Sequence, residues 1–173
     1  VLRQWLEDEG ISYYNIIGDE IEGGDVIIDQ DTIYIGLSNR TNQEAINHLS
    51  ELLNKQFEVI SVDFQEKYLH LDCVFNVVSE KIALIYPPAL KKENIELFSS
   101  RYDLIEVTAT EQFTLGTNVL AIGQNRILSL PVNKDVNEQL RNRGFEVIEV
   151  DITEIIKSGG SFRCCTLPIL RES

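Results

Sequence analysis

Four polar residues that could take part in chemistry recur along the chain at nearly constant spacing. They are separated by 47, 46 and 46 residues and are Asp25, Asp72, Asn118 and Cys164. If the chain is built of repeated units around a common axis, equivalent positions converge on that axis. The spacing therefore predicts that these four side chains meet in one buried site.

A cysteine nucleophile is the chemistry that this set favours. A thiol needs a lowered pKa or a neighbouring base to react at neutral pH. His70 is in phase with Cys164 and could serve as general acid and base, while the carboxylate of Glu22 could orient it. A buried cysteine is more often a small apolar residue. For Cys164, the glycine pair at 159–160 and the adjacent Arg163 favour the role of nucleophile over that of a small apolar residue.

Carboxylates at the same site indicate a cationic substrate. Asp72 could accept two N–H donors from a planar cation. Arg40, between an expected strand and an expected helix, could bind the carboxylate of an amino-acid substrate, although an arginine there often only caps or solvates. Asp25 is a further candidate ligand, with the capping of a turn as its alternative.

The remaining cysteines and histidine receive structural interpretations. We expect Cys73 and Cys165 to be small apolar residues and His48, on a helical stretch, to face solvent. Three cysteines and His70 could form a zinc site, but no C-x₂-C or H-x₃-H spacing is present. We therefore expect no metal and no cofactor.

The elements that must position these residues repeat every 45 residues or so. Three near-equivalent strands, FEVISVD, YDLIEVT and FEVIEVD, each follow a stretch with helical spacing of apolar residues, and paired strands precede each helix. Gly144 marks the end of the last helix. The sequence predicts a single domain of β-β-α-β units at about 18–63, 70–108 and 116–151. It also predicts the closing part of an earlier unit at 1–17 and an opening strand at 159–173.

Composition narrows the class of function. The chain has 173 residues, 43% of them hydrophobic, and a net charge of −13. An acidic surface disfavours nucleic acid and anionic lipid as partners, and a small cation is the better candidate. An odd number of cysteines does not indicate a disulfide framework, so we expect a cytoplasmic protein. The chain contains no Met and opens within a predicted helix at Val1–Glu9, so we expect it to be a fragment or a processed piece.

Five motifs in order resemble the guanidine-modifying superfamily of arginine deiminases, dimethylarginine dimethylaminohydrolases and amidinotransferases. They are EGGDV at 22–26, LSNRTNQ at 37–43, HLDCVF at 70–75, GTN at 116–118 and GGSFRCCT at 159–166. The dimethylaminohydrolases are the most similar group. The resemblance implies a pseudo-symmetric five-bladed α/β propeller of ββαβ units, the pentein fold, of which this chain supplies about three blades.

The resemblance also implies a role for each matching residue. Cys164 is the nucleophile, His70 the general acid and base, and Glu22 its partner. Asp72 binds the guanidinium and Arg40 the substrate carboxylate, while Asn118 matches a position on the substrate side. The implied reaction is attack of the thiolate on the guanidine carbon of arginine or a methylated arginine. An amine or ammonia leaves, and hydrolysis of the thioether gives citrulline.

Two departures from the family pattern leave alternatives open. The N-terminal half that carries a further guanidinium-binding acid is absent, so we expect a missing segment or a partner chain, and a homo-oligomer is a further possibility. LSNRTNQ and the paired cysteines resemble the dimethylaminohydrolases, whereas HLD resembles the deiminases and amidinotransferases. An amidinotransferase is therefore the alternative reaction. A non-catalytic ribosome-binding propeller is the alternative of another class.

Overall fold

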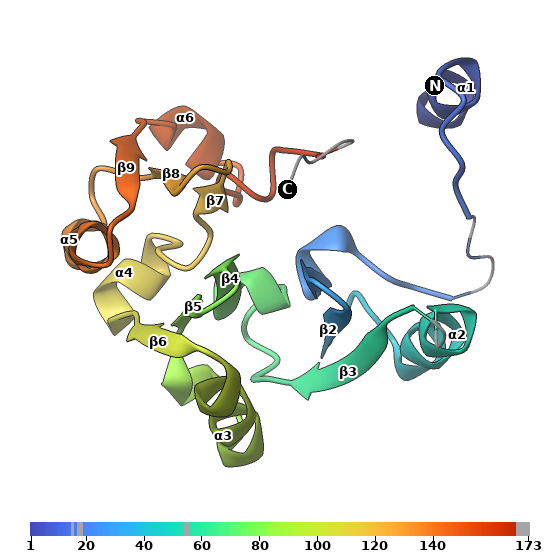
Figure 1. Ribbon diagram of the computed structural model, residues 1–173, viewed down its shortest axis with the longest axis horizontal. Coiled ribbons are helices and arrows are strands. Elements are labelled where there is room, and N and C mark those ends of the chain that lie inside the picture. The colour runs from blue at the N-terminus through green and yellow to red at the C-terminus, as the bar shows by residue number, and fades with distance from the viewer. Residues whose placement is uncertain (15, 17–18, 54–55, 169–173) are drawn as a thin grey trace.

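Three small sheets repeat one strand order along the chain (Figure 1). In each, an antiparallel hairpin is followed by a helix and by a third strand that pairs in parallel with the second. The computed structural model describes residues 1–14, 16, 19–53 and 56–168. The three units, in the β-β-α-β order that the sequence predicts, are β1 (Val26–Asp29), β2 (Thr32–Leu37), α2 (Gln43–Leu53) and β3 (Glu58–Asp63); β4 (Phe75–Ser79), β5 (Ile82–Ile85), α3 (Lys92–Arg101) and β6 (Asp103–Glu106); and β7 (Leu120–Ala121), β8 (Arg126–Ser129), α5 (Lys134–Asn142) and β9 (Glu146–Glu149).

Short helices and turns precede the first strand of each unit. Asp25 and Asp72 lie on single turns of 3-10 helix directly before β1 and β4, and a turn at 114–117 precedes β7. Equivalent turns place these residues at the same end of each unit. The short helices are η1 (Gly23–Asp25), η2 (Leu71–Cys73), η3 (Pro87–Ala89), α4 (Ala109–Phe113) and α6 (Thr153–Ile156).

Apolar side chains hold neighbouring units together. The cluster between the first and second units joins Ile27, Tyr34 and Val62 to Phe75 and Phe98, among others, and all five are buried. The two phenylalanine rings stack with centroids 3.7 Å apart. A second cluster joins the second unit to the third. The helices α2, α3 and α5 lie on the outer side of the arc that the three sheets form (Figure 1).

The helix of the third unit follows its sequence pattern. Val136 and Leu140, four residues apart and so on one face of α5, are both fully buried. The helix ends at Asn142, and Gly144 has a φ of +88°, the left-handed conformation that glycine adopts without steric cost. This confirms the prediction that Gly144 marks the end of the last helix.

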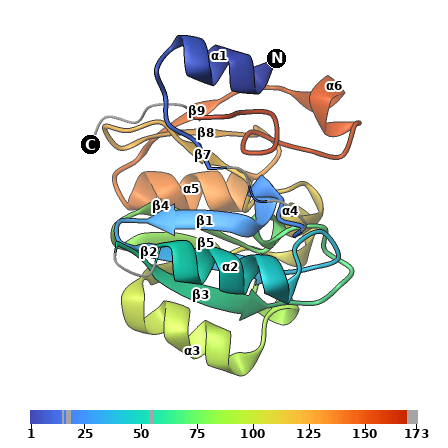
Figure 2. The same ribbon diagram turned by 90° about the vertical axis from the view of Figure 1, so that its right-hand side faces the viewer.

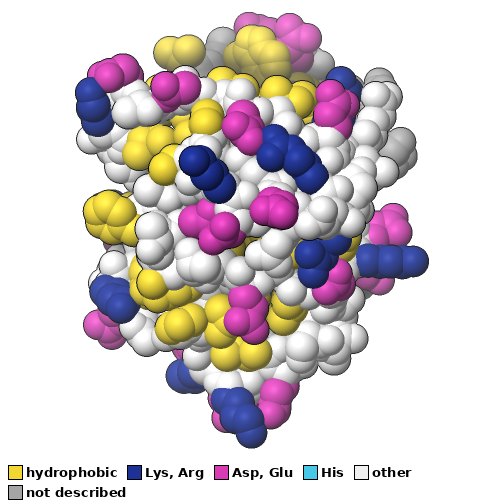
Figure 3. All heavy atoms as spheres, turned by 90° about the vertical axis from the view of Figure 1, so that its left-hand side faces the viewer, with side chains coloured by type: hydrophobic (Ala, Val, Ile, Leu, Met, Phe, Trp, Pro, Cys, Tyr) yellow, Lys and Arg dark blue, Asp and Glu magenta, His cyan; other side chains and the backbone are white. Residues whose placement is uncertain are grey.

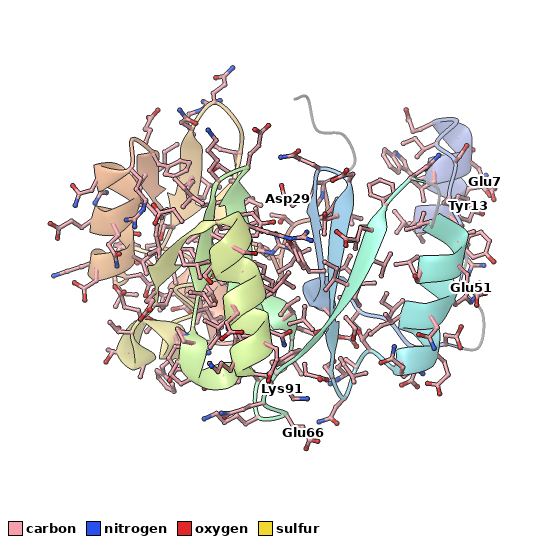
Figure 4. The ribbon with its side chains drawn as sticks, turned by 60° about the horizontal axis from the view of Figure 1, so that its bottom comes forward. Glu7, Tyr13, Asp29, Glu51, Glu66 and Lys91 are labelled. Carbon is pink, nitrogen blue, oxygen red and sulfur yellow. The ribbon has the colours of Figure 1, made fainter. Side chains whose placement is uncertain are left out.

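A polar clasp also joins the first two units. The hydroxyl of Tyr102 donates to Asp29 Oδ2 at 2.6 Å and lies 3.0 Å from the hydroxyl of Tyr34. Arg101 Nη1 donates to the same Tyr34 hydroxyl at 3.2 Å. Figure 4 shows Asp29 on β1, between the first and second units. Burial first, and then the hydrogen bond to Asp29, raise the pKa of Tyr102, so this side chain stays a neutral donor.

Removing one hydroxyl from this clasp should destabilise the fold. In a Tyr102→Phe variant, Asp29 loses its donor and Tyr34 loses a partner, so the free energy of unfolding should fall by about 1–3 kcal/mol. Chemical denaturation measures this change. The matched control is Tyr13→Phe, because Tyr13 is 42% exposed and its hydroxyl contacts only the exposed Glu7 among the hydrogen bonds of the described residues. Its effect should stay within about 0.5 kcal/mol. Equal losses in the two variants would contradict the clasp.

The two chain ends differ from the sequence expectation. Residues 11–14 and 16, expected in the closing strand of an earlier unit, are not in a strand, and 15 and 17 lie outside the described residues. Residues 159–168, expected in an opening strand, form a turn and an irregular stretch, and 169–173 lie outside the described residues. A strand needs a neighbour for its backbone hydrogen bonds, and no described strand pairs with either segment.

Helix α1 (Leu2–Asp8) stands apart from the three units. Figure 1 shows it separated from the sheets, Figure 2 shows it at one end of the molecule, and none of its residues is buried. On the face that carries α5, Lys and Arg side chains stand among Asp and Glu (Figure 3), so the negative charge does not gather there. Within the described part of the chain, no helix combines the length and apolar character needed to cross a membrane.

Candidate functional site

The buried carboxylate of Asp25 ties together the loops that build the site. Its Oδ1 accepts from the backbone N–H of Leu71 at 2.9 Å, which joins the turns η1 and η2. Its Oδ2 accepts from Ser38 Oγ at 2.7 Å and Thr41 Oγ1 at 2.8 Å. Three protein donors thus occupy this carboxylate, and Asp25 is not among the residues that line the cavity described below. Asp25 thus connects the loops of the site, and the substrate-binding role suggested by the sequence stays a prediction.

His70 and Glu22 form a close pair across these two turns. The ring Nε2 lies 2.6 Å from Glu22 Oε2, and the imidazole side chain is only 14% exposed. The ring passes directly over Gly24, where a Cβ would lie 2.7 Å from both Cγ and Nδ1 of His70. The EGGDV motif therefore does more than turn the chain, because its second glycine makes the space that the imidazole occupies.

The two glycines of this motif provide a sharp comparison. A Gly24→Ala substitution should displace the imidazole from Glu22 and lower turnover about 100-fold, the loss that a misplacement of about 1 Å can cause. Gly23→Ala should lower turnover much less, because a Cβ there meets nothing within 4 Å among the described residues, although Gly23 also lines the cavity described below. Steady-state kinetics of the two variants measure the difference. Equal activities would show that His70 is not held as described.

Asn118 reaches the sulfur of Cys164 from the third unit. Its Nδ2 donates to Sγ at 3.4 Å, and its Oδ1 accepts from the backbone N–H of Arg163 at 3.0 Å. The side chain is fully buried. Gly160 lies against this cysteine, because a Cβ added to Gly160 would lie only 2.9 Å from the Cβ of Cys164. The thiol is thus held in a tight turn with its sulfur turned toward a side-chain donor.

A cavity of about 790 Å³ brings the predicted reactive groups together. Asp72 and Cys164, two of the four residues with constant spacing, line it together with Glu22 and His70, whereas Asp25 and Asn118 are not in its wall. Arg163 lies in the same wall, with its Nε 3.6 Å from Oδ2 of the buried Asp72. The rest of the wall is formed by Gly23, Gly24, Val26, Ile28, Leu120, Thr166, Leu167 and Pro168. The wall therefore combines acidic and nucleophilic side chains with apolar ones.

Two groups in this cavity have raised pKa values. Desolvation of the sulfur first, and the negative charge of Asp72 second, raise the pKa of the Cys164 thiol. The exposure of Cys164, the hydrogen bond from Asn118 and the charge of Arg163 limit this rise. Burial likewise raises the pKa of Asp72, against the opposing charges of Arg163 and His70. For the neighbouring Cys73, burial raises the pKa to about 12, so its thiol stays protonated and fits the apolar interpretation. A positive charge placed beside Cys164 would therefore favour its thiolate.

Arg40 lies beside the cavity and not in its wall. It lines a separate hollow of about 550 Å³, and Glu22 belongs to the walls of both. Its Nη1 lies 3.3 Å from Glu22 Oε1, and the side chain is 55% exposed. Glu22 therefore holds His70 with one oxygen and Arg40 with the other, which links the two hollows.

Some contacts around the site were not foreseen from the sequence. Ser38 and Thr41 flank Arg40 in LSNRTNQ, and their hydroxyls are typical of such turns, but only the arginine was weighed. His48, expected to face solvent, has Nδ1 2.9 Å from Asp19 Oδ2. Among the described residues, no three His, Cys, Asp or Glu side chains are grouped so that they could hold a metal ion.

Comparison with known proteins identifies the family. The family model of N,N dimethylarginine dimethylhydrolase, eukaryotic, matches residues 1–171. The chain belongs to this family. The resemblance to the guanidine-modifying superfamily is thereby confirmed. Two relatives are the YkgA protein of Bacillus subtilis (strain 168), 53% identical over 171 residues, and the N(G),N(G)-dimethylarginine dimethylaminohydrolase of Mycobacterium tuberculosis (strain ATCC 25618 / H37Rv), 32% identical over 148 residues.

Solved structures share the fold of this family member. The N-terminal domain of ArgZ, an arginine dihydrolase from the ornithine-ammonia cycle in Cyanobacteria, was solved bound to product. It superimposes with a TM-score of 0.86 at 25% identity, over 98% of this chain and 64% of that one. The match to the B. subtilis relative includes 99% of this chain and 59% of that protein. The match to the M. tuberculosis relative includes 84% of this chain and 48% of that protein. It thus spans about half the length of these relatives.

Proposed function

We propose that this protein hydrolyses the guanidine group of arginine or a methylated arginine through a covalent cysteine thioether. The observation that carries the proposal is the common cavity of Cys164, Asp72 and the His70–Glu22 pair. Membership of the dimethylarginine dimethylhydrolase family supports it. So does the likeness to ArgZ, an arginine dihydrolase.

In the proposed reaction, the Cys164 thiolate adds to the guanidine carbon and forms a carbon–sulfur bond. His70, held by Glu22, gives a proton to the leaving nitrogen as the carbon–nitrogen bond breaks, and an amidino thioether remains on Cys164. The now neutral His70 takes a proton from water, which adds to the same carbon. The carbon–sulfur bond then breaks, the thiolate returns, and the hydroxyl group added from water loses its proton to solvent as it becomes the carbonyl of citrulline. The ammonia or methylated amine has already left in the first step.

The proposed substrate contacts use both ends of an arginine-like molecule. Asp72 would accept hydrogen bonds from the guanidinium, and Asn118 would lie beside the reacting carbon through its contact with Cys164. Arg40 would bind the α-carboxylate. Its present ion pair with Glu22 joins two exposed side chains, and such pairs contribute only about 0–1 kcal/mol, so a substrate carboxylate could recruit the arginine at small cost.

A product assay on the full-length protein tests this proposal. Incubation with arginine and with asymmetric dimethylarginine should give citrulline, and the amine released with it, ammonia or dimethylamine, assigns the substrate. A product in which an added amine carries the amidino group would indicate an amidinotransferase instead. If no guanidine is consumed, and alkylation of Cys164 has no effect on any activity of the protein, the proposed hydrolase is wrong and a non-catalytic binding role takes its place.

We also propose that the three units are three blades of a five-bladed propeller. The two ends of the arc carry exposed apolar side chains, such as Trp5 and Tyr14 on one side and Leu167 on the other, at 41%, 59% and 65% exposure. Large exposed apolar surfaces mark contacts with other segments or chains. The missing two blades would come from a further segment of the same protein or from a partner chain, packed beside 1–17 and 159–173.

Residues 1–173 expressed alone should accordingly fail to behave as a stable monomer. The exposed apolar ends should cause association or a broad, non-cooperative unfolding transition. Sedimentation velocity and thermal unfolding measure these properties, with the full-length protein as the control. A monodisperse monomer of the piece that unfolds cooperatively would contradict the proposed completion of the propeller.

A further inference from the structure

A buried asparagine within an apolar strand stands out among the groups that the proposed reaction does not use. Asn76 lies on β4 in the run CVFNVVS and is 1% exposed. Its Oδ1 is buried and accepts no hydrogen bond from any described residue. Burying an unsatisfied polar atom costs free energy, so the side chain needs a compensating role.

The amide nitrogen of this residue supplies that role. Asn76 Nδ2 donates to the carbonyl oxygen of Thr117 at 2.8 Å and to that of Val119 at 2.9 Å. These two carbonyls flank Asn118 on either side. One buried side chain from the second unit therefore fixes the backbone of the third unit on both sides of the residue that contacts the nucleophile.

The same loop is tied to the guanidinium ligand. Thr117 Oγ1 donates to the backbone carbonyl of Asp72 at 3.0 Å. Asn118 then reaches forward to Cys164 Sγ at 3.4 Å and to the N–H of Arg163 at 3.0 Å. The chain of contacts runs from β4 through the 117–119 loop to the cysteine. It thus fixes the thiol relative to the carboxylate of Asp72.

We propose that Asn76 is a positioning residue that holds Asn118 in place as the donor to the Cys164 sulfur. The inference rests on the proposed function, since it gives the contact between Asn118 and Cys164 a catalytic purpose. A donor aimed at sulfur favours the thiolate over the thiol. Asn76 therefore tunes the nucleophile without touching the substrate.

The tuning acts among several charges that face the same sulfur. Asp72 disfavours the thiolate, whereas Arg163 favours it, and His70 and Glu22 line the same cavity. Asn118 is an uncharged donor in this set, so its contribution depends on its orientation. Loss of the two hydrogen bonds from Asn76 frees that orientation, and the balance moves toward the thiol.

The matched pair Asn76→Ser and Asn137→Ser tests the proposal in the full-length protein. Asn137 is also fully buried and donates from Nδ2 to a backbone carbonyl, that of Leu130, at 2.9 Å, but it lies on α5 and outside the cavity wall. Both substitutions remove a buried amide of the same kind, so both should lower stability to a similar degree. Only Asn76→Ser should change the chemistry of Cys164.

The readout is the pH dependence of alkylation of Cys164 by iodoacetamide, measured below the unfolding temperature of each variant. Trypsin cleaves after Arg163, so the peptide that begins at Cys164 reports the modification, and its fragment ions separate Cys164 from Cys165. Asn76→Ser should move the profile to higher pH and lower kcat about 10- to 100-fold, the effect of misplacing a group at the site. Asn137→Ser should leave both unchanged.

A double variant decides whether Asn76 acts through Asn118. If it does, Asn76→Ser should shift the alkylation profile no further in an Asn118→Ala background. A shift of full size in that background, or equal shifts for Asn76→Ser and Asn137→Ser, would overturn the inference. Alkylation needs no turnover. An inactive wild type would therefore count against the proposed hydrolase alone, while an unshifted profile in Asn76→Ser would count against this inference alone.

Discussion

Replacing the sulfur of Cys164 by oxygen, in a Cys164→Ser variant, should abolish turnover and leave substrate binding nearly unchanged. A serine hydroxyl in this cavity ionises far less readily than a thiol, so the first bond to the guanidine carbon does not form. Loss of a covalent nucleophile commonly lowers kcat by a factor of about 10⁴ or more. Binding should stay within about one order of magnitude, because Asp72 and Arg40 are untouched. Stopped-flow kinetics and calorimetry with arginine measure the two quantities.

The adjacent cysteine is the natural control for this prediction. Both cysteines are exposed, but Cys165 donates weakly to the carbonyl of Phe162 at 3.6 Å and, unlike Cys164, does not line the cavity. A Cys165→Ser variant should therefore keep its turnover. Activity that survives in Cys164→Ser, or disappears in Cys165→Ser, would show that the other cysteine is the nucleophile.

The period of the sequence predicted the arrangement of the units well, because local patterns determine it. Each helix shows a helical spacing of apolar residues, and short apolar runs mark the paired strands before it. The order β-β-α-β could therefore be predicted without long-range information. Constant spacing between Asp72, Asn118 and Cys164 then placed them on equivalent turns. That the carboxylate and the thiol share a cavity follows from this equivalence.

The hydrogen-bond partners at the site could not be predicted in the same way. Whether Asp25 faces a ligand or the protein depends on the path of the loop with Ser38 and Thr41, and residue spacing does not determine that path. The position of Arg40 outside the cavity wall has the same cause. Asn76 left a visible signal, since a polar residue interrupts an apolar strand, but its partners in the 117–119 loop come from another unit.

In the described parts of 11–17 and 159–173, which are 11–14, 16 and 159–168, the expected strands are absent for a related reason. Apolar residues and a turn signal are sufficient to suggest a strand, but the strand forms only when a neighbour supplies hydrogen bonds. No described strand pairs with the described residues of either segment. The structure of these segments therefore depends on contacts that a pattern in the chain itself does not contain.

Substitution of Asp72 should change the reactivity of Cys164 in opposite directions toward neutral and cationic reagents. In the free protein the Asp72 carboxylate is a cause of the raised pKa of the Cys164 thiol, second to burial. An Asp72→Asn variant removes that charge, so the pKa should fall and more thiolate should be present at neutral pH. Iodoacetamide, which is neutral, should therefore alkylate Cys164 faster in the variant than in the wild type.

A cationic electrophile such as 2-chloroacetamidine should give the reverse result. Its amidinium needs the Asp72 carboxylate both to bind and to neutralise the charge that suppresses the thiolate, so the variant should react more slowly. KM for arginine should rise about 10- to 100-fold, the cost of a hydrogen bond to a charged group. Asp103→Asn, which removes an exposed carboxylate paired with Arg143, is the control and should alter none of these rates.

If Asp72→Asn changed both alkylation rates in the same direction, Asp72 would affect only the general reactivity of the thiol. If instead the rates diverge, the acidic cavity and the cysteine nucleophile are compatible, because the substrate's own positive charge makes the thiol reactive when it binds.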